Sequence, residues 1–142
     1  MTATTSTSGA LPVTVVSGGP VAGVASDATL LEVADALAAA GVGALVVGSG
    51  DRPAGIVSER DLVAALAARR DPAATTAADV AHTTLVWCDA TATVAEVAEL
   101  MMERYIRHAL VEDDGRLVGI VSARDLLGIY AAGDMGSDAD EE

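Results

Sequence analysis

The sequence predicts a mixed α/β (α+β) protein built from two β-α-β-β-α repeats that pack with pseudo-two-fold symmetry. The first observation is an internal repeat, because GIVSERDL at Gly55–Leu62 recurs as GIVSARDL at Gly119–Leu126, 64 positions later and with one difference. The second observation is that helix and strand signals recur at the same offset without a gap. Repeats of this length mark duplicated supersecondary units.

Each copy is expected to start with a short strand, Val21–Ala25 or Leu85–Cys88, followed by a helix. A Thr-x-x-Glu capping box marks the start of both helices, at Thr29–Glu32 and Thr93–Glu96. In such a box the hydroxyl and the carboxylate satisfy backbone N–H groups at the helix start. An apolar stripe with helical spacing follows each box. Its members are Leu30, Val33, Ala34 and Leu37 in the first copy, and Val94, Val97, Ala98 and Met101 in the second.

Two apolar strands and a closing helix complete each copy. Gly41 is expected to end the first helix in the left-handed conformation. The strand pairs are Val42–Val47 with Ala54–Val57, and His108–Val111 with Leu117–Val121. A turn joins each pair, at residues 49–51 and 113–115, where Gly and Asp gather. The closing helix runs from Glu59 to about Arg70, and from Ala123 to about Ala131.

These elements predict four segments along the chain. A disordered N-terminal tail covers residues 1–10, which are rich in Thr and Ser. The first repeat covers residues 11–72 and the second covers residues 73–132. An acidic disordered tail covers residues 133–142, where acidic side chains predominate.

Composition restricts the partners. The net charge is −13, and this sign repels phosphate backbones and anionic membranes, so neither nucleic acid nor a membrane is expected as a partner. No apolar run approaches the ~20 residues that span a bilayer, and the N-terminus lacks the basic and apolar parts of a secretory signal. A cytoplasmic location is therefore expected.

The chain is a poor candidate for an enzyme. It has no recognisable nucleophile-base-carboxylate set, and neither the P-loop nor the dinucleotide-binding glycine pattern occurs. The histidines His82 and His108 lack zinc-ligand spacing, so no metal site is expected. Cys88 is the one cysteine and lies in a predicted buried strand, where it is either an inert apolar side chain or, less commonly, a reactive thiol.

The repeated junction has two interpretations. A helix N-terminus attracts an anionic phosphate, and an Asp carboxylate can accept both hydroxyls of a vicinal diol. Arg60 adds positive charge in the same helical turn as Asp61, and Arg124 does so in the same turn as Asp125. However, Ser58–Asp61 and Ser122–Asp125 also match a capping box that needs no ligand, and duplication copies a cap as readily as a binding site. The residues alone leave both interpretations open.

A tandem pair of β-α-β-β-α units that each close on G-h-h-[ST]-x-x-D, where h is apolar, resembles the CBS-domain pair, named after cystathionine beta-synthase. The resemblance covers about Ala10–Ala132. It implies a regulatory module that senses a ligand, with an adenosyl nucleotide (AMP, ADP, ATP or S-adenosylmethionine) bound in clefts between the two CBS repeats and no required cofactor. It also implies a homodimer and allows for a regulated protein partner. The alternative is a dimeric interaction or scaffold protein that works without nucleotide.

The resemblance also implies ligand-binding residues. Asp61 and Asp125 match the carboxylate that holds the ribose hydroxyls, and Ser58 and Ser122 match a hydroxyl that contacts phosphate or ribose. The segments Val21, Ala22 and Val86, Trp87 match the lining of the adenine site, and His108 matches a basic position facing the phosphate. The full set of predicted ligand-binding residues is Ser58, Arg60, Asp61, Val21, Ala22, Val86, Trp87, His108, Ser122, Arg124 and Asp125.

The two copies differ at these positions. Trp87 and His108 in the second copy stand where the first has Gly23 and Ala44. Trp87 can stack on a base or simply pack, and His108 can contact phosphate or lie at the surface. At the junction itself Glu59 adds negative charge where Ala123 does not, which is unfavourable for a phosphate. The second junction is therefore predicted to be the stronger site.

Overall fold

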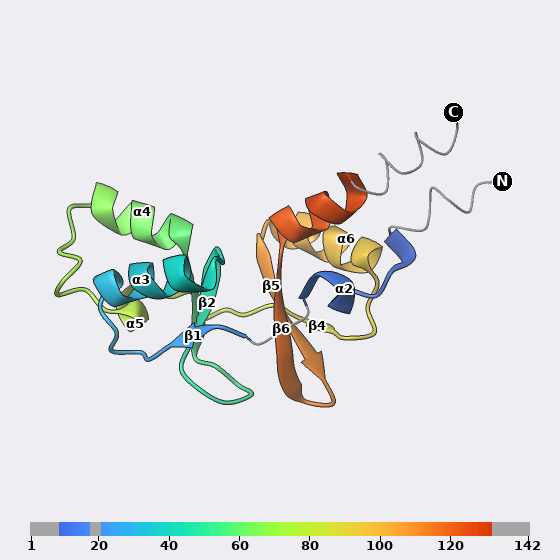
Figure 1. The fold of residues 1–142 in the computed structure, drawn as a ribbon, viewed down its shortest axis with the longest axis horizontal. Helices are drawn as coiled ribbons and strands as arrows, with labels where there is room; N and C mark the ends of the chain where they lie inside the picture. The colour runs from blue at the N-terminus through green and yellow to red at the C-terminus, as the bar shows by residue number, and fades with distance from the viewer. Residues whose placement is uncertain (1–8, 18–20, 132–142) are drawn as a thin grey trace. The chain divides into compact units, whose positions relative to one another are not determined.

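The computed structural model describes residues 9–17 and 21–131, and it confirms the mixed α/β class with two small sheets (Figure 1). The chain divides into two compact units. The first-repeat unit is Val21–Leu85, and the second-repeat unit combines the described residues 9–17 with residues 86–131. None of the described helices has the length and apolar character needed to cross a bilayer.

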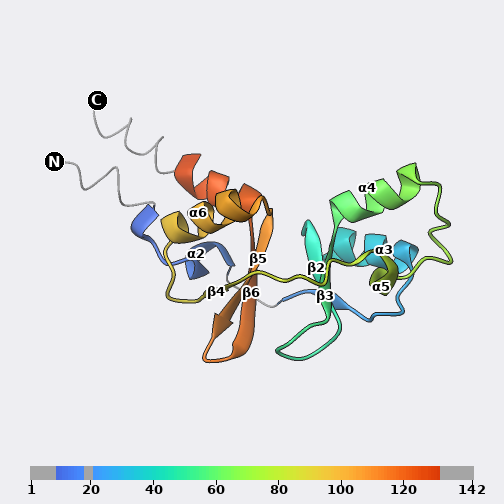
Figure 2. The same ribbon diagram turned by 180° about the vertical axis from the view of Figure 1, so that it is seen from behind.

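The first-repeat unit contains a three-stranded sheet with the order β1-β2-β3. Strand β1 (Gly23–Val24) runs parallel to β2 (Ala44–Val47), and β3 (Gly55–Ser58) is antiparallel to β2. Helices α3 (Leu30–Ala40) and α4 (Glu59–Ala67) lie on the same side of this sheet, with the short helix α5 (Ala77–Val80) beside them (Figure 2). The buried core of the unit is Val33, Leu37, Leu45, Val47, Val57 and Ala77.

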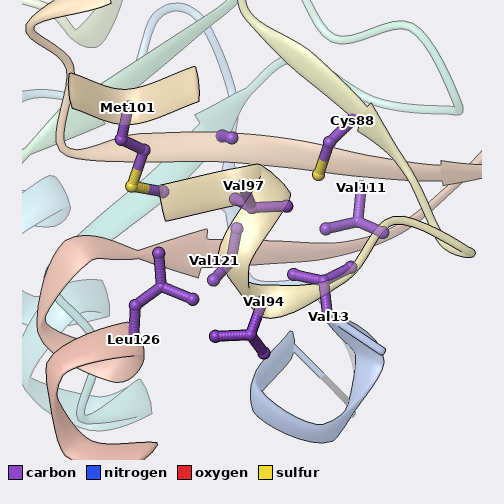
Figure 3. Packing of buried hydrophobic residues seen from close by; sticks show 9 residues of the cluster. Val13, Cys88, Val94, Val97, Met101, Val111, Val121 and Leu126 are labelled. Carbon is purple, nitrogen blue, oxygen red and sulfur yellow. The ribbon is translucent and has the colours of Figure 1, made fainter. Parts of the chain in front are cut away.

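The second-repeat unit repeats this plan. Its strands are β4 (Trp87–Asp89), β5 (His108–Asp113) and β6 (Arg116–Ser122), in the order β4-β5-β6. Its helices are α2 (Thr14–Ser17), α6 (Val94–Arg104) and a helix over residues 123–131. The core, shown in Figure 3, consists of Val13, Cys88, Val94, Val97, Met101, Ala109, Val111, Val121 and Leu126. Pseudo-two-fold packing of the two repeats stays a prediction.

The predicted capping boxes of α3 and α6 are both present. The Thr29 N–H donates to Glu32 Oε1 at 2.9 Å, and the Glu32 N–H donates to Thr29 Oγ1 at 3.2 Å. Thr93 and Glu96 form the same pair of bonds, at 2.8 and 3.2 Å. Gly41 adopts the predicted left-handed conformation, with φ 66°. The two helices therefore begin where local sequence chemistry places them.

Several predicted boundaries were wrong. The first strand is shorter than the predicted Val21–Ala25, because only the two residues of β1 pair with β2. The strand β4 is shifted from the predicted Leu85–Cys88 and covers Trp87–Asp89. The strand β2 starts at Ala44 rather than Val42, which is exposed. Helix α4 ends at Ala67 instead of near Arg70, since Arg69 has a left-handed φ of 64°. Ala34, predicted in the apolar stripe of α3, is exposed.

The structure contains two short helices, α2 and α5, that the sequence did not predict. Each lies in the unit that the predicted repeat boundaries assign to the other repeat. Val13, just before α2, is fully buried in the second-repeat core, and its N–H donates to Ala92 O at 2.8 Å. Ala77 of α5 is fully buried in the first-repeat core. The compact units thus differ from residues 11–72 and 73–132. The segment of Val13 and α2 belongs to the second-repeat unit, and the segment of α5 belongs to the first-repeat unit.

The predicted tails are mostly outside the described residues. Residues 1–8 of the N-terminal tail and residues 133–142 of the acidic tail are not described. Residues 9 and 10 were predicted as disordered and are instead helical, with Gly9 close to Ala95 and Tyr130.

Gly119 allows residue 17 to lie against β6. A Cβ on Gly119 would overlap the backbone oxygen of Ser17. We expect Gly119→Ala to destabilise the protein by about 1–3 kcal/mol, the usual cost of overpacking. Gly128→Ala is the control, because a Cβ there meets nothing within 4 Å and alanine favours a helix. Urea unfolding measures both variants, and equal stability of the two would contradict this prediction.

Cys88 is buried in the second-repeat core. Desolvation raises the pKa of its thiol to about 11, and the negative charges of Asp89 and Glu112 act in the same direction. Because the thiolate is the reactive form, we expect a thiol-specific reagent near pH 8 to modify native Cys88 slowly, and the urea-unfolded chain rapidly. Fast, stoichiometric modification of the native protein would instead show that the thiol is accessible and reactive.

Candidate functional site

The repeated junctions lie where the last strand of each sheet enters a helix. In the first-repeat unit Ser58 ends β3 and caps α4. In the second-repeat unit Ser122 ends β6, immediately before the helix over residues 123–131. Both serines are half-buried. The duplicated sequence thus produces a strand-to-helix junction twice, as the repeat predicts.

The second junction is a complete capping box. The Ser122 N–H donates to Asp125 Oδ2 at 3.2 Å, and the Asp125 N–H donates to Ser122 Oγ at 3.0 Å. Within the described part of the chain, the Asp125 carboxylate receives no other hydrogen bond. Asp125 is exposed, so its second oxygen is available to a ligand.

The first junction uses its carboxylate more fully. The Ser58 N–H and the Ser58 hydroxyl both donate to Asp61 Oδ2, at 2.8 and 3.0 Å. The other oxygen, Oδ1, lies 2.7 Å from His82 Nε2, which donates to it. The Asp61 side chain is only 11% exposed, whereas His82 is 68% exposed. The two junctions therefore differ in how many acceptor positions remain for a ligand.

Backbone contacts hold His82 in this position. It lies along the edge of β3, where the Ile56 N–H donates to His82 O at 3.0 Å and the His82 N–H donates to Ile56 O at 2.9 Å. Gly55 makes this approach feasible, because a Cβ there would lie 2.8 Å from His82 O. Sequence reasoning considered His82 only as a zinc ligand and missed this role. No local pattern links residues that are 21 positions apart.

The predicted adenine-lining segments lie beside the middle strand of each sheet. Val21, Ala22, Val86 and Trp87 are all half-buried. The Ala22 carbonyl accepts the Val46 N–H at 3.1 Å, and the Val86 carbonyl accepts the Leu110 N–H at 2.9 Å. Each of these two carbonyls therefore takes part in the hydrogen bonding of its own sheet.

Trp87, His108 and Ser122 share one face of the second sheet. His108 pairs directly with Ser122, and Trp87 pairs with Leu110, two residues beyond His108. Paired residues and residues two apart on a strand point to the same side. The opposite side carries the buried core residues Ala109 and Val111. The sheet thus gathers three predicted ligand residues on the face away from the core.

The equivalent face in the first-repeat unit is nearly bare of such groups. Ala44 pairs with Ser58, and Gly23 pairs with Val46, two residues beyond Ala44. Gly23 and Ala44 therefore occupy the places of Trp87 and His108, as the repeat predicts. Only the serine hydroxyl is polar in this set.

The two arginines lie in the first turn after each junction. Arg60 is exposed on α4, and Arg124 is exposed on the helix over residues 123–131. The first-repeat unit thus contains five of the predicted residues and the second-repeat unit contains six. A further polar group in the second-repeat unit is Ser17, whose hydroxyl is buried against Gly119 and has no hydrogen-bond partner among the described residues.

Comparison with known proteins matches this architecture. A family model described as the CBS domain matches residues 15–68 and again residues 77–132. Hypoxic response protein 1 of Mycobacterium tuberculosis is 38% identical over 87 residues, which are 60% of this chain and 61% of that protein. The chain thus covers less than two thirds of that relative's length.

Solved structures extend the likeness over most of the described fold. The CBS domain protein PAE2072 from Pyrobaculum aerophilum, solved as a complex with AMP, has a TM-score of 0.73 and 32% identity, covering 86% of this chain and 99% of that one. The CBS-domain containing protein ATU1752 from Agrobacterium tumefaciens has a TM-score of 0.70 and 33% identity, covering 77% of this chain and 88% of that one. With both repeats matched, the chain belongs to the CBS-domain family.

Proposed function

We propose that the chain is a regulatory module that binds an adenosyl nucleotide, with the second junction as its principal site. The observation that carries this proposal is the Asp125 carboxylate, which is exposed and has one oxygen without a partner among the described residues. The complex of PAE2072 with AMP supports the ligand class, since that protein is 32% identical to this chain.

The residues around Asp125 suit the parts of a nucleotide. The free carboxylate oxygen can accept ribose hydroxyls, and the N-terminus of the helix over residues 123–131 can receive a phosphate. Arg124 places a positive charge next to the junction, in a chain whose net charge of −13 otherwise repels an anion. Trp87 lies on the same sheet face as His108 and offers an aromatic surface for the base.

A second candidate function is nucleotide-independent association with another copy or with a protein partner. Large apolar side chains are exposed on several helices, notably Val63 and Leu66 on α4, at 66% and 52%, and Met102 on α6, at 76%. Val63 and Leu66 lie three residues apart on α4 and give this helix exposed apolar surface that a partner could cover. In either function the chain acts by binding, and neither requires catalysis or a metal.

Thermal unfolding with AMP, ADP, ATP and S-adenosylmethionine tests the nucleotide proposal. A ligand that binds only the folded state stabilises it by about 2.7 kcal/mol at a hundredfold excess over its Kd. We expect at least one of these compounds to raise the melting temperature. Unchanged melting with all four, at low and at physiological salt, would contradict nucleotide binding and favour the association function.

Asp125→Ala separates the ligand role from the capping role. We expect this variant to lose the nucleotide-induced rise in melting temperature and about 1 kcal/mol of stability, the usual value of a cap. Glu96→Ala is the matched control, because it removes the equivalent capping carboxylate of α6 outside the proposed site. It should lose similar stability and keep the nucleotide response. If both variants keep the response, Asp125 is only a cap.

A further inference from the structure

The first junction has a feature that the second lacks, the contact of His82 with the carboxylate of Asp61. His82 Nε2 lies 2.7 Å from Asp61 Oδ1, a short distance for a nitrogen-to-carboxylate hydrogen bond. The contact joins an exposed imidazole to a carboxylate that is only 11% exposed. The imidazole therefore covers the side of the carboxylate that Ser58 does not use.

Counting hydrogen bonds shows what remains for a ligand. A carboxylate has about four lone-pair positions on its two oxygens. In Asp61 three of these are used, by the Ser58 N–H, the Ser58 hydroxyl and His82 Nε2. About one position remains, and a vicinal diol needs two. At Asp125 only the Ser122 N–H donates among the described residues, so about three positions remain.

The difference is built into the chain. The backbone of His82 is fixed to β3 by two hydrogen bonds with Ile56, which keeps the imidazole within reach of Asp61. In the repeat register the residue equivalent to His82 is Gly18, which has no side chain to offer. Gly18 itself lies outside the described residues. The two junctions thus share the Ser-x-x-Asp motif, but among the described residues only the aspartate of the first is contacted by a histidine.

From this geometry we infer that His82 is a specificity-determining residue that closes the first junction to the ribose diol, so that the chain binds one nucleotide, at the second junction. This inference rests on the proposed function and adds to it the number of ligands and their location. His82 acts by occupying the acceptor that a nucleotide would need. Removing its side chain opens a second site.

The test is the number of AMP molecules bound per chain, measured by isothermal titration calorimetry on the full chain. We expect one for the native sequence and two for His82→Ala. His82→Gln, whose amide N–H can still donate to Asp61, should remain at one. Thr83→Ala is the matched control, because this neighbour is exposed and its side chain forms no hydrogen bond with any described residue, and it should also remain at one.

Combining variants identifies the junction that is filled. Asp125→Ala should bind no AMP, and adding His82→Ala to it should restore one site. Since the contacts that fix position 82 are made by the backbone, we expect these variants to fold, and circular dichroism verifies this.

Each result decides between the two proposals. Two AMP molecules bound by the native sequence, or one bound by His82→Ala, would overturn the inference and leave nucleotide binding intact. Binding to His82→Ala but not to the native sequence would support the closing role of His82 and contradict the second junction as a site. The absence of binding to both would overturn nucleotide binding and, with it, the inference.

Discussion

The close approach of a chain segment to the last strand of each sheet is the constraint on which the rest of the structure depends. At β3 the segment is the Ala81–His82 backbone, and at β6 it is Ser17. Both approaches are sterically possible only because Gly55 and Gly119 lack a Cβ. The glycine that opens the repeated motif therefore serves packing first, since it lets a short helix and its flanking residues complete each unit.

This packing determines which groups surround the serine and the aspartate that the two junctions share. The same four-residue pattern, Ser-x-x-Asp, closes both sheets, yet the carboxylate has different neighbours in each. The Asp61 carboxylate accepts a hydrogen bond from the imidazole of His82, whereas the Asp125 carboxylate accepts none from any described residue outside its own cap. A cap and a binding group are thus not exclusive roles, because a carboxylate has more acceptor positions than a cap requires. The neighbours decide how many positions are left.

The asymmetry between the repeats extends across each sheet. Trp87 and His108 share a face with Ser122, whereas Gly23 and Ala44 share the equivalent face with Ser58. Three differences therefore distinguish the two junctions. They are Trp87 against Gly23 on the first strand, His108 against Ala44 on the second strand, and His82, in the segment beside the last strand, against Gly18 in the repeat register.

The sequence by itself determined the duplicated architecture, the family and the starts of α3 and α6, because these depend on local patterns. Capping boxes act over three residues, and strand alternation acts over two, so both are visible in the printed letters. Only the tertiary structure decided where α2 and α5 pack and that His82 meets Asp61. These contacts depend on where the chain goes after a turn, and the repeat register hides them, since it aligns His82 with a glycine. A motif read along the chain locates a junction, but the segment folded against it decides its chemistry.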